Sequence, residues 1–242
     1  IGEETASQMR LAVTFYERLS SYPFSIMKES LSFRTQECVD QNCRFRFPVM
    51  EGKTAISSCP KCGAAFNGDS ISYGRHYVER GDISSSSFEM HVLLDNIRSL
   101  YNVGSVFRTA VGVGIKKLHL CGMTATPENP RLAKTALGAE KSLPWAYYNN
   151  ALLAGKGLIE EGYSLWAVEG GEGAVSLFDA KPPEANERIV LIIGNELAGI
   201  DPELLKICEK IVYIPMQGGK ESLNLTVAFG IAAYFLRNLN YA

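Results

Sequence analysis

The chain has 242 residues, of which 46% are hydrophobic and 21% charged, and its formal net charge is −2. This length and composition suit one large or two modest domains with a real core. The near-neutral charge gives no global signal for nucleic acid or membrane binding, although it leaves a local basic face possible. The sequence has no signal peptide and no apolar run of about 20 residues, which predicts a soluble, cytoplasmic protein without a membrane partner.

A helix is predicted from Ile1 to about Tyr22, and two short cysteine knuckles follow it. The cysteines are Cys38, Cys43, Cys59 and Cys62. This spacing suits a tetrahedral zinc ion, and four thiolates leave no open position, so the predicted site is structural. Two disulfides or four unrelated thiols are the alternatives. Cys121 and Cys208 stand alone in apolar contexts, which is typical of an intracellular chain and argues against disulfides.

Basic and aromatic residues alternate between the knuckles, in the sequence Arg44-Phe45-Arg46-Phe47. Such a strand has one cationic face, and with Lys61 it could contact RNA phosphates and bases. A solvated strand face over a small core is the alternative. The serine run of residues 84–87 is typical of a linker. We therefore predict a helical and zinc-ribbon-like domain over residues 1–87 and a second domain over 88–242.

Strands and helices alternate after the linker. The predicted strands are Met90–Leu94, Lys117–Cys121, Trp145–Tyr148, Leu165–Val168, Ile189–Ile193 and Ile211–Ile214. The predicted helices are Val103–Val113, Pro130–Leu137, Ala151–Glu161, Pro202–Cys208 and a last one capped by Ser222 and reaching Tyr234. This order predicts an α/β fold with a mostly parallel sheet and helices on both faces. Its functional site is expected at the carboxyl ends of the strands.

Three motifs follow predicted strands. The first runs from Asn102 through Gly104 to Arg108, one side of a helix start. The second is the segment Gly194-Asn195-Glu196-Leu197-Ala198-Gly199, and the third joins Ile214-Pro215-Met216 to Ser222-Leu223-Asn224. In this order the motifs resemble those of the SPOUT superfamily, in its TrmH-like branch of RNA ribose 2′-O-methyltransferases. The resemblance covers residues 89–239 and leaves the N-terminal region without a counterpart.

The resemblance implies a deep C-terminal trefoil knot that binds S-adenosylmethionine, a homodimer, and tRNA or rRNA as the substrate. The residues expected at the cofactor are Val168, Gly170, Gly194, Asn195, Gly199, Ile214, Met216 and Leu223. Those expected at the reacting ribose are Arg108, Asn102, Glu196, Ser222 and Asn224. Those expected to bind RNA are Arg44, Arg46, Lys61 and Arg98. In the second motif, Asn195 stands where the family commonly has serine.

The family assigns proton removal from the ribose hydroxyl to the arginine that matches Arg108. Because a guanidinium is a poor base, we expect Arg108 to pair with a neighbouring phosphate and stabilise alkoxide charge, whether or not it takes the proton. A structural ion pair with Glu196 is the alternative. Asn102 and Asn224 are expected to orient ribose and loop. Ser222 either does the same or only caps the helix, and Glu196 either braces the loop or touches substrate.

Two other functions remain open. The segment Gly171-Glu172-Gly173 follows a strand and superficially suggests a dinucleotide loop, but the third glycine of that motif is missing, so a nucleotide-binding oxidoreductase is disfavoured. A non-catalytic RNA-binding protein could have kept the fold and lost the reaction. The intact motif residues argue against this second alternative.

Overall fold

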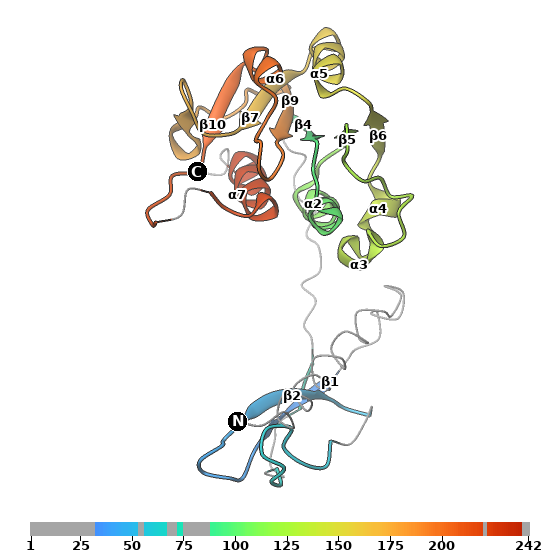
Figure 1. The fold of residues 1–242 in the computed structure, drawn as a ribbon, viewed down its shortest axis with the longest axis vertical. Helices are drawn as coiled ribbons and strands as arrows, with labels where there is room; N and C mark the ends of the chain where they lie inside the picture. The colour runs from blue at the N-terminus through green and yellow to red at the C-terminus, as the bar shows by residue number, and fades with distance from the viewer. Residues whose placement is uncertain (1–31, 53–55, 67–71, 75–87, 220–221, 239–242) are drawn as a thin grey trace. The chain divides into compact units, whose positions relative to one another are not determined.

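The computed structural model describes residues 32–52, 56–66, 72–74, 88–219 and 222–238 (Figure 1). It divides into two compact units, residues 1–81 and 82–242, and each is treated separately. The predicted helix of residues 1–22 and the serine linker lie outside the described residues. The domain boundary predicted after residue 87 also lies there, so all three stay predictions.

The first unit contains a small antiparallel sheet in the order β2-β1-β3. Its strands are β1 (Ser32–Glu37), β2 (Arg46–Met50) and β3 (Ser72–Gly74). Val49 and Met50 are buried, whereas Phe47 packs between the rings of Phe45 and Phe66. The predicted strand over residues 44–47 is therefore only half right. Arg44 precedes β2 in a left-handed conformation with φ 43°, which no strand residue adopts.

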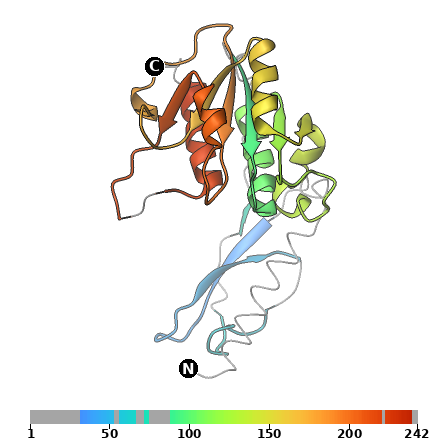
Figure 2. The ribbon, with the colours of Figure 1, turned by 45° about the horizontal axis from the view of Figure 1, so that its top comes forward.

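The second unit is built on a seven-stranded parallel sheet in the order β6-β5-β4-β9-β7-β10-β8 (Figure 2). The strands are β4 (Glu89–Asp95), β5 (Leu118–Cys121), β6 (Trp145–Tyr148), β7 (Ser164–Val168), β8 (Val175–Ser176), β9 (Arg188–Ile193) and β10 (Lys210–Tyr213). All strands that the sequence predicts for this second unit are present. The two-residue β8 was missed because it is too short to produce a hydrophobic pattern.

Helices cover both faces of this sheet, as predicted. They are α2 (Leu100–Val113), α3 (Ala133–Ala136), α4 (Ala139–Ser142), α5 (Ala151–Glu160), α6 (Pro202–Lys206) and α7 (Leu225–Asn238). α2 and α7 lie together on one face, over Met90, Val92 and Leu94 of β4. α5 and α6 cover the other face, where Leu93 points. This alternation follows from the two-residue period of a strand.

The last helix begins later than predicted. It starts at Leu225, and the Asn224 carbonyl accepts the amide hydrogen of Ala228 at 2.9 Å, as an N-cap residue does. The Asn224 side chain accepts from the Thr226 amide at 2.9 Å. Asn224 therefore replaces Ser222 as the cap. At the other end, the buried Arg237 guanidinium donates to the Val113 carbonyl at 3.1 Å, which holds α7 to the end of α2.

A buried chain of polar side chains crosses the face under α5. His91 Nδ1 lies 3.1 Å from His119 Nε2, and His119 Nδ1 lies 3.4 Å from the Tyr148 hydroxyl. His91 Nε2 lies 3.0 Å from a Glu89 carboxylate oxygen. Two neutral imidazoles satisfy this chain, because each ring then donates from one nitrogen and accepts at the other. Burial lowers the pKa of His91 and lowers that of His119 to about 3.

Candidate active site

The three sequence motifs meet at one edge of the sheet. The strands β4, β9, β7 and β10 are consecutive neighbours and run parallel, so the segments that leave their carboxyl ends lie side by side. These segments are the first motif loop (residues 96–99, leading into α2), the strap (residues 169–174), the second motif loop (residues 194–199) and the third motif loop (residues 214–219 and 222–224). The edge is the place expected for a ligand in an open parallel sheet.

Glu196 braces the first motif loop. Its carboxylate accepts hydrogen bonds from the Arg98 amide at 2.9 Å, the Ser99 amide at 3.0 Å and Asn102 Nδ2 at 2.9 Å. Partial burial acts to raise the pKa of Glu196, but these bonds outweigh it and the pKa lies below the usual value. Ser99 in turn caps α2, since its hydroxyl accepts from the Asn102 amide at 3.3 Å. Glu196 and Asn102 thus form one brace at the start of α2.

The second motif loop closes on itself through its backbone. Asn195 and Gly199 exchange two amide-to-carbonyl hydrogen bonds of 2.9 Å. A Cβ atom on Gly194 would lie 2.4 Å from the Gly199 carbonyl carbon, so this position admits only glycine. Gly199 has φ 73°, and the following amide of Ile200 donates to the Glu169 carboxylate at 3.2 Å. These contacts join the second motif loop to the start of the strap.

Asn96 joins three loops, and sequence reasoning missed it as a site residue. Its side-chain oxygen accepts from the Met123 amide at 3.1 Å, and its carbonyl accepts from Asn195 Nδ2 at 2.6 Å. Its own amide group donates to Asp95 at 2.8 Å. Asn96 adopts φ 57°, a conformation that asparagine tolerates better than most residues. An Asp-Asn pair directly after a buried strand was the available signal.

The third motif loop contrasts with the first two. Among the described residues, the backbone of residues 215–219 makes no hydrogen bond, and Met216 is 37% exposed. Ile214 and Val168 pack against the core, so they hold the two ends of the strands beneath this loop. Leu223 is half-buried and Ser222 is exposed. In the described part of the chain, the loop therefore offers unpaired backbone groups beside apolar side chains, a combination that is typical of small-molecule sites.

Arg108 lies on the exposed side of α2, two turns from its start. It forms no ion pair or hydrogen bond with another residue of the described ranges, so the predicted alternative of an ion pair with Glu196 is wrong. Gly104, one turn earlier, faces α3, and a Cβ there would lie 2.7 Å from the Leu132 carbonyl oxygen. Close helix packing, and not ligand approach, accounts for this glycine. Arg98 is exposed next to the brace.

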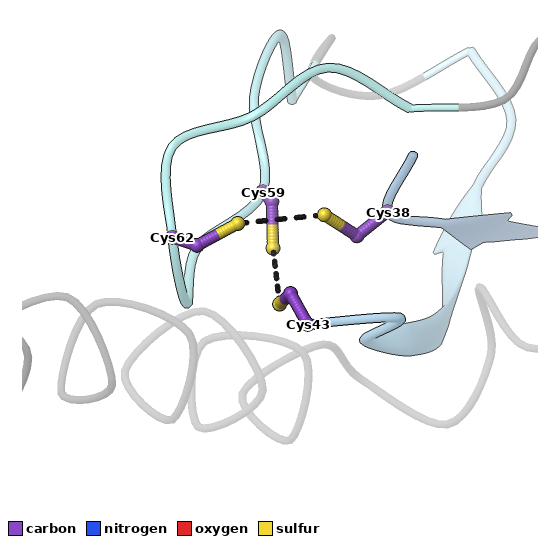
Figure 3. Close-up of side chains that lie close together, drawn as sticks. All are labelled: Cys38, Cys43, Cys59 and Cys62. Carbon is purple, nitrogen blue, oxygen red and sulfur yellow. Dashed lines mark hydrogen bonds between the residues drawn. The ribbon is translucent and has the colours of Figure 1, made fainter. Parts of the chain in front are cut away.

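The four predicted metal ligands lie together in the first unit (Figure 3). All of their sulfur atoms fall within 4.8 Å of one another, with Cys38 to Cys62 at 3.4 Å and Cys43 to Cys59 at 3.8 Å. Zinc–sulfur bonds of about 2.3 Å in a tetrahedron separate sulfurs by about 3.8 Å, so the spacing fits a zinc ion. All four are free thiols, which disagrees with the disulfide alternative. Burial raises the pKa of Cys38 to about 12 when no metal is bound.

The basic residues of the first unit are partly neutralised. Arg46 and Arg44 both pair with Glu37, at 2.8 and 3.4 Å, and both side chains remain more than 60% exposed. The exposed Lys61 donates its backbone amide to Cys59 Sγ at 3.4 Å. These three positions share the neighbourhood of the cysteine cluster. In the part of the chain that the structure describes, no helix is long and apolar enough to cross a membrane.

The comparison with known protein families decides the class of protein. The model of the SpoU rRNA Methylase family matches residues 89–234, which span the sheet and all three motifs. The chain belongs to the SpoU rRNA methylase family. This match confirms the resemblance predicted from the three motifs, and the parallel sheet with helices on both faces is confirmed as well.

Curated relatives and solved structures are similar to more than half of the chain. The 23S rRNA (guanosine(2553)-2′-O)-methyltransferase RlmP of Bacillus subtilis is 32% identical over 146 residues, which are 60% of this chain and 57% of that protein. The AdoMet-bound rRNA methyltransferase of Sinorhizobium meliloti superposes with a TM-score of 0.58 and 28% identity, covering 64% of this chain and 57% of that one. The chain spans between 42% and 64% of the length of the first curated relatives it matches.

Proposed function

We propose that this SpoU-family protein is an S-adenosylmethionine-dependent methyltransferase that modifies a ribose 2′-hydroxyl of tRNA or rRNA. The observation that carries this proposal is the meeting of the braced first and second motif loops with the unpaired third loop at one sheet edge. The names of RlmP and of the AdoMet-bound relative point to the same reaction type and cofactor.

The cofactor would be held by the strap and the second and third motif loops. Gly194, Asn195 and Gly199 supply a rigid backbone turn. Val168 ends β7 and Gly170 follows it in the strap, while Ile214, Met216 and Leu223 supply apolar surface. Because the backbone groups of residues 215–219 make no hydrogen bond to another described residue, they can bind the polar edge of an adenine. The bound cofactor supplies a methyl group on a positively charged sulfur, already activated for attack by an oxygen nucleophile.

The protein then has to position the ribose and ease removal of its hydroxyl proton. Arg108 is exposed and unpaired among the described residues, so it is free to pair with a phosphate beside the reacting ribose and stabilise alkoxide charge. Glu196 and Asn102 act by holding the loop that carries Arg98 and leads into α2. Asn224 is committed to the cap of α7, and Ser222 is the exposed hydroxyl nearest to it in sequence.

A C-terminal knot is part of the proposal. Six residues, 169–174, join β7 to β8, yet β10 lies between these strands: Val212 pairs with Val168 on one side and with Val175 on the other. The strap therefore spans the carboxyl end of β10. The chain that leaves β10 starts inside this span and then continues to α7. A threaded C-terminal segment accounts for this strand order.

A homodimer is also proposed, and apolar side chains on the outer side of α7 support it. Val227 and Tyr234 are 49% and 47% exposed there, and Phe178, which packs edge-on against Phe235, is 51% exposed. Apolar side chains gathered on one helix face are typical of an interface. The two copies would bring RNA and cofactor together across this contact.

The first unit is proposed to hold a structural zinc ion on its four cysteines and to help select the RNA. Support comes from the sulfur spacing and from the exposed Arg44, Arg46 and Lys61 near it. The domain limits after residue 87 and a cytoplasmic location belong to the same proposal.

The oxidoreductase alternative loses its basis, because Gly171 and Gly173 lead into the two-residue β8 and not into a helix that could bind a pyrophosphate.

The decisive experiment measures methyl transfer from labelled S-adenosylmethionine to tRNA and, separately, to rRNA, with nucleoside analysis of the product. We expect a 2′-O-methylated nucleoside, reduced at least 100-fold by Arg108→Ala and not rescued by Arg108→Lys, because a lysine cannot form the two-pronged contact with a phosphate. Lys156→Ala, which changes an exposed cation on α5, is the matched control. Binding of RNA and cofactor without transfer by the wild-type protein would instead support the non-catalytic alternative.

A further inference from the structure

A shallow hollow lies at the carboxyl ends of β5 and β6, outside all three motif loops. Its volume is about 750 Å³, and it is lined by residues within 122–131 and by Tyr147 of β6. It is open to solvent, unlike the cavity of a buried cofactor. No residue predicted from the sequence lies in it. The hollow is large enough for a nucleotide, since small-molecule sites in proteins typically measure about 300–1,000 Å³.

Two hydrogen-bonded contacts fix this hollow to the candidate active site. The Met123 amide donates to the Asn96 side chain at 3.1 Å, and Asn96 also binds Asn195 of the second motif loop. The buried Thr124 hydroxyl accepts from the Ile97 amide at 2.9 Å and donates to the Leu94 carbonyl at 3.2 Å. One wall of the hollow is therefore continuous with the segment that carries Arg98 and starts α2.

A second connection runs through α2. The carbonyl of Leu132, directly after the hollow residue Arg131, packs against Gly104, and the Thr135 hydroxyl donates to the Tyr101 carbonyl at 3.1 Å. Gly104 lies one helical turn before Arg108. The hollow is thus held against the same helix that presents the proposed catalytic arginine.

The side chains of the hollow suit a nucleotide better than a protein or a purely apolar ligand. Met123 is 65% exposed and Tyr147 is 45% exposed, and the Tyr147 hydroxyl donates to the Gly122 carbonyl at 2.7 Å, which fixes its ring. The exposed Arg131 guanidinium has no partner among the described residues, whereas its backbone amide binds Asn129. A held aromatic ring, a thioether and a free cation match a base and its phosphate.

We infer that this hollow binds an unpaired nucleotide of the RNA substrate. The base contacts Tyr147 and Met123, and the phosphate pairs with Arg131. The inference rests on the proposed function and deepens it: the RNA is engaged at a single-stranded loop or end, because a base inside a helix cannot present its face to Tyr147. The reacting ribose then belongs to this nucleotide or to its neighbour, next to Arg108.

The test measures binding of the full chain to a mixed-sequence single-stranded RNA of ten nucleotides and to its blunt duplex. We expect Tyr147→Ala and Arg131→Ala each to weaken single-strand binding about tenfold, and Tyr147→Phe to keep most of it because the ring remains. Leu153→Ala and Lys156→Ala are the controls, since Leu153 is as exposed as Met123, at 65%, but lies on α5. Affinity for S-adenosylmethionine should stay within twofold in every variant, which also reports correct folding.

A second measurement does not depend on any variant. Titration of the wild-type chain with the four nucleoside 5′-monophosphates should shift the NMR signals of backbone amides within residues 122–131 in a saturable way. Unchanged amide signals there, or alanine variants that bind single-stranded RNA as wild type does, would overturn the inference. Loss of binding in these variants together with no methyl transfer by the wild-type chain would support the hollow and overturn the proposed reaction.

Discussion

The two compact units of this protein are stabilised by different means. The second unit has a large apolar core on both faces of its sheet, in which most of β9 and most of β4 are buried. The described part of the first unit buries only Val49 and Met50 among its hydrophobic residues, besides Cys38 and Cys59. A unit with so small a core usually needs a metal or disulfides, and its cysteines are free. We therefore expect only the first unit to depend on a metal for its folding.

Removal of the proposed zinc ion should therefore affect the two units differently, and this is the largest effect that we expect. We expect a chelator, or Cys59→Ser, to unfold the first unit, because binding of structural zinc contributes about 10–16 kcal/mol to the folding of such small units. The second unit should keep its unfolding temperature. NMR spectra of the full chain, with zinc content measured in parallel, check this. Cys208→Ser, at a half-buried thiol of the second unit, is the control. Loss of both units together would contradict the comparison.

Acid should act on the second unit instead. In the folded chain the pKa of His119 is lowered by burial, and by nearby His91 and Lys117, to about 3 from 6.5. Below pH 6.5 this histidine binds a proton in the unfolded chain but stays neutral in the folded chain. The free energy of unfolding is therefore highest above that pH and falls as the pH drops toward 3. The expected loss is a few kcal/mol, since one pKa unit corresponds to about 1.4 kcal/mol.

Urea unfolding of the second unit between pH 7 and pH 4 measures this effect. His119→Asn should flatten the curve, although it also lowers stability at pH 7 through lost packing. The pKa of His91 is also lowered by burial, and its ring contacts Tyr163 and lies near the charges of Glu89, Arg188 and Lys117. His91→Asn should therefore flatten the curve further. A slope that is unchanged in both variants would assign the acid sensitivity to other groups.

The smallest effect is expected within the active-site edge. Glu196→Gln should weaken three hydrogen bonds to the first motif loop, at a cost of about 1.5–3 kcal/mol, since bonds to a charged acceptor are replaced by weaker ones and one acceptor oxygen becomes a donor. Amide hydrogen exchange at Arg98 and Ser99 should rise, and methyl transfer should fall while affinity for S-adenosylmethionine holds. Glu160→Gln on α5 is the control. Unchanged exchange would mean that Glu196 contacts substrate and does not brace the loop.

Six strands of the sheet, the order of the motifs and the grouping of the four cysteines could be predicted from the sequence alone. A continuous apolar run such as residues 189–193, which is too short for a typical helix, predicts a buried parallel strand, and the spacing of the motifs and cysteines can be recognised without the fold. The boundaries of short elements were less predictable. β8 depends on a long-range partner, Val212 of β10, whereas α7 starts at Leu225 because Asn224, and not Ser222, caps it.

The residues that brace the site, and the hollow beside it, could not be predicted from the sequence, because they depend on contacts between distant segments. Glu196 reaches residues nearly 100 positions away in sequence, and Asn96 links loops from three strands. The hollow beside Tyr147 joins segments that no local pattern connects. Parallel strands bring such segments together at their carboxyl ends because their crossover connections reverse the chain each time, and this convergence is a property of topology and not of any stretch of sequence.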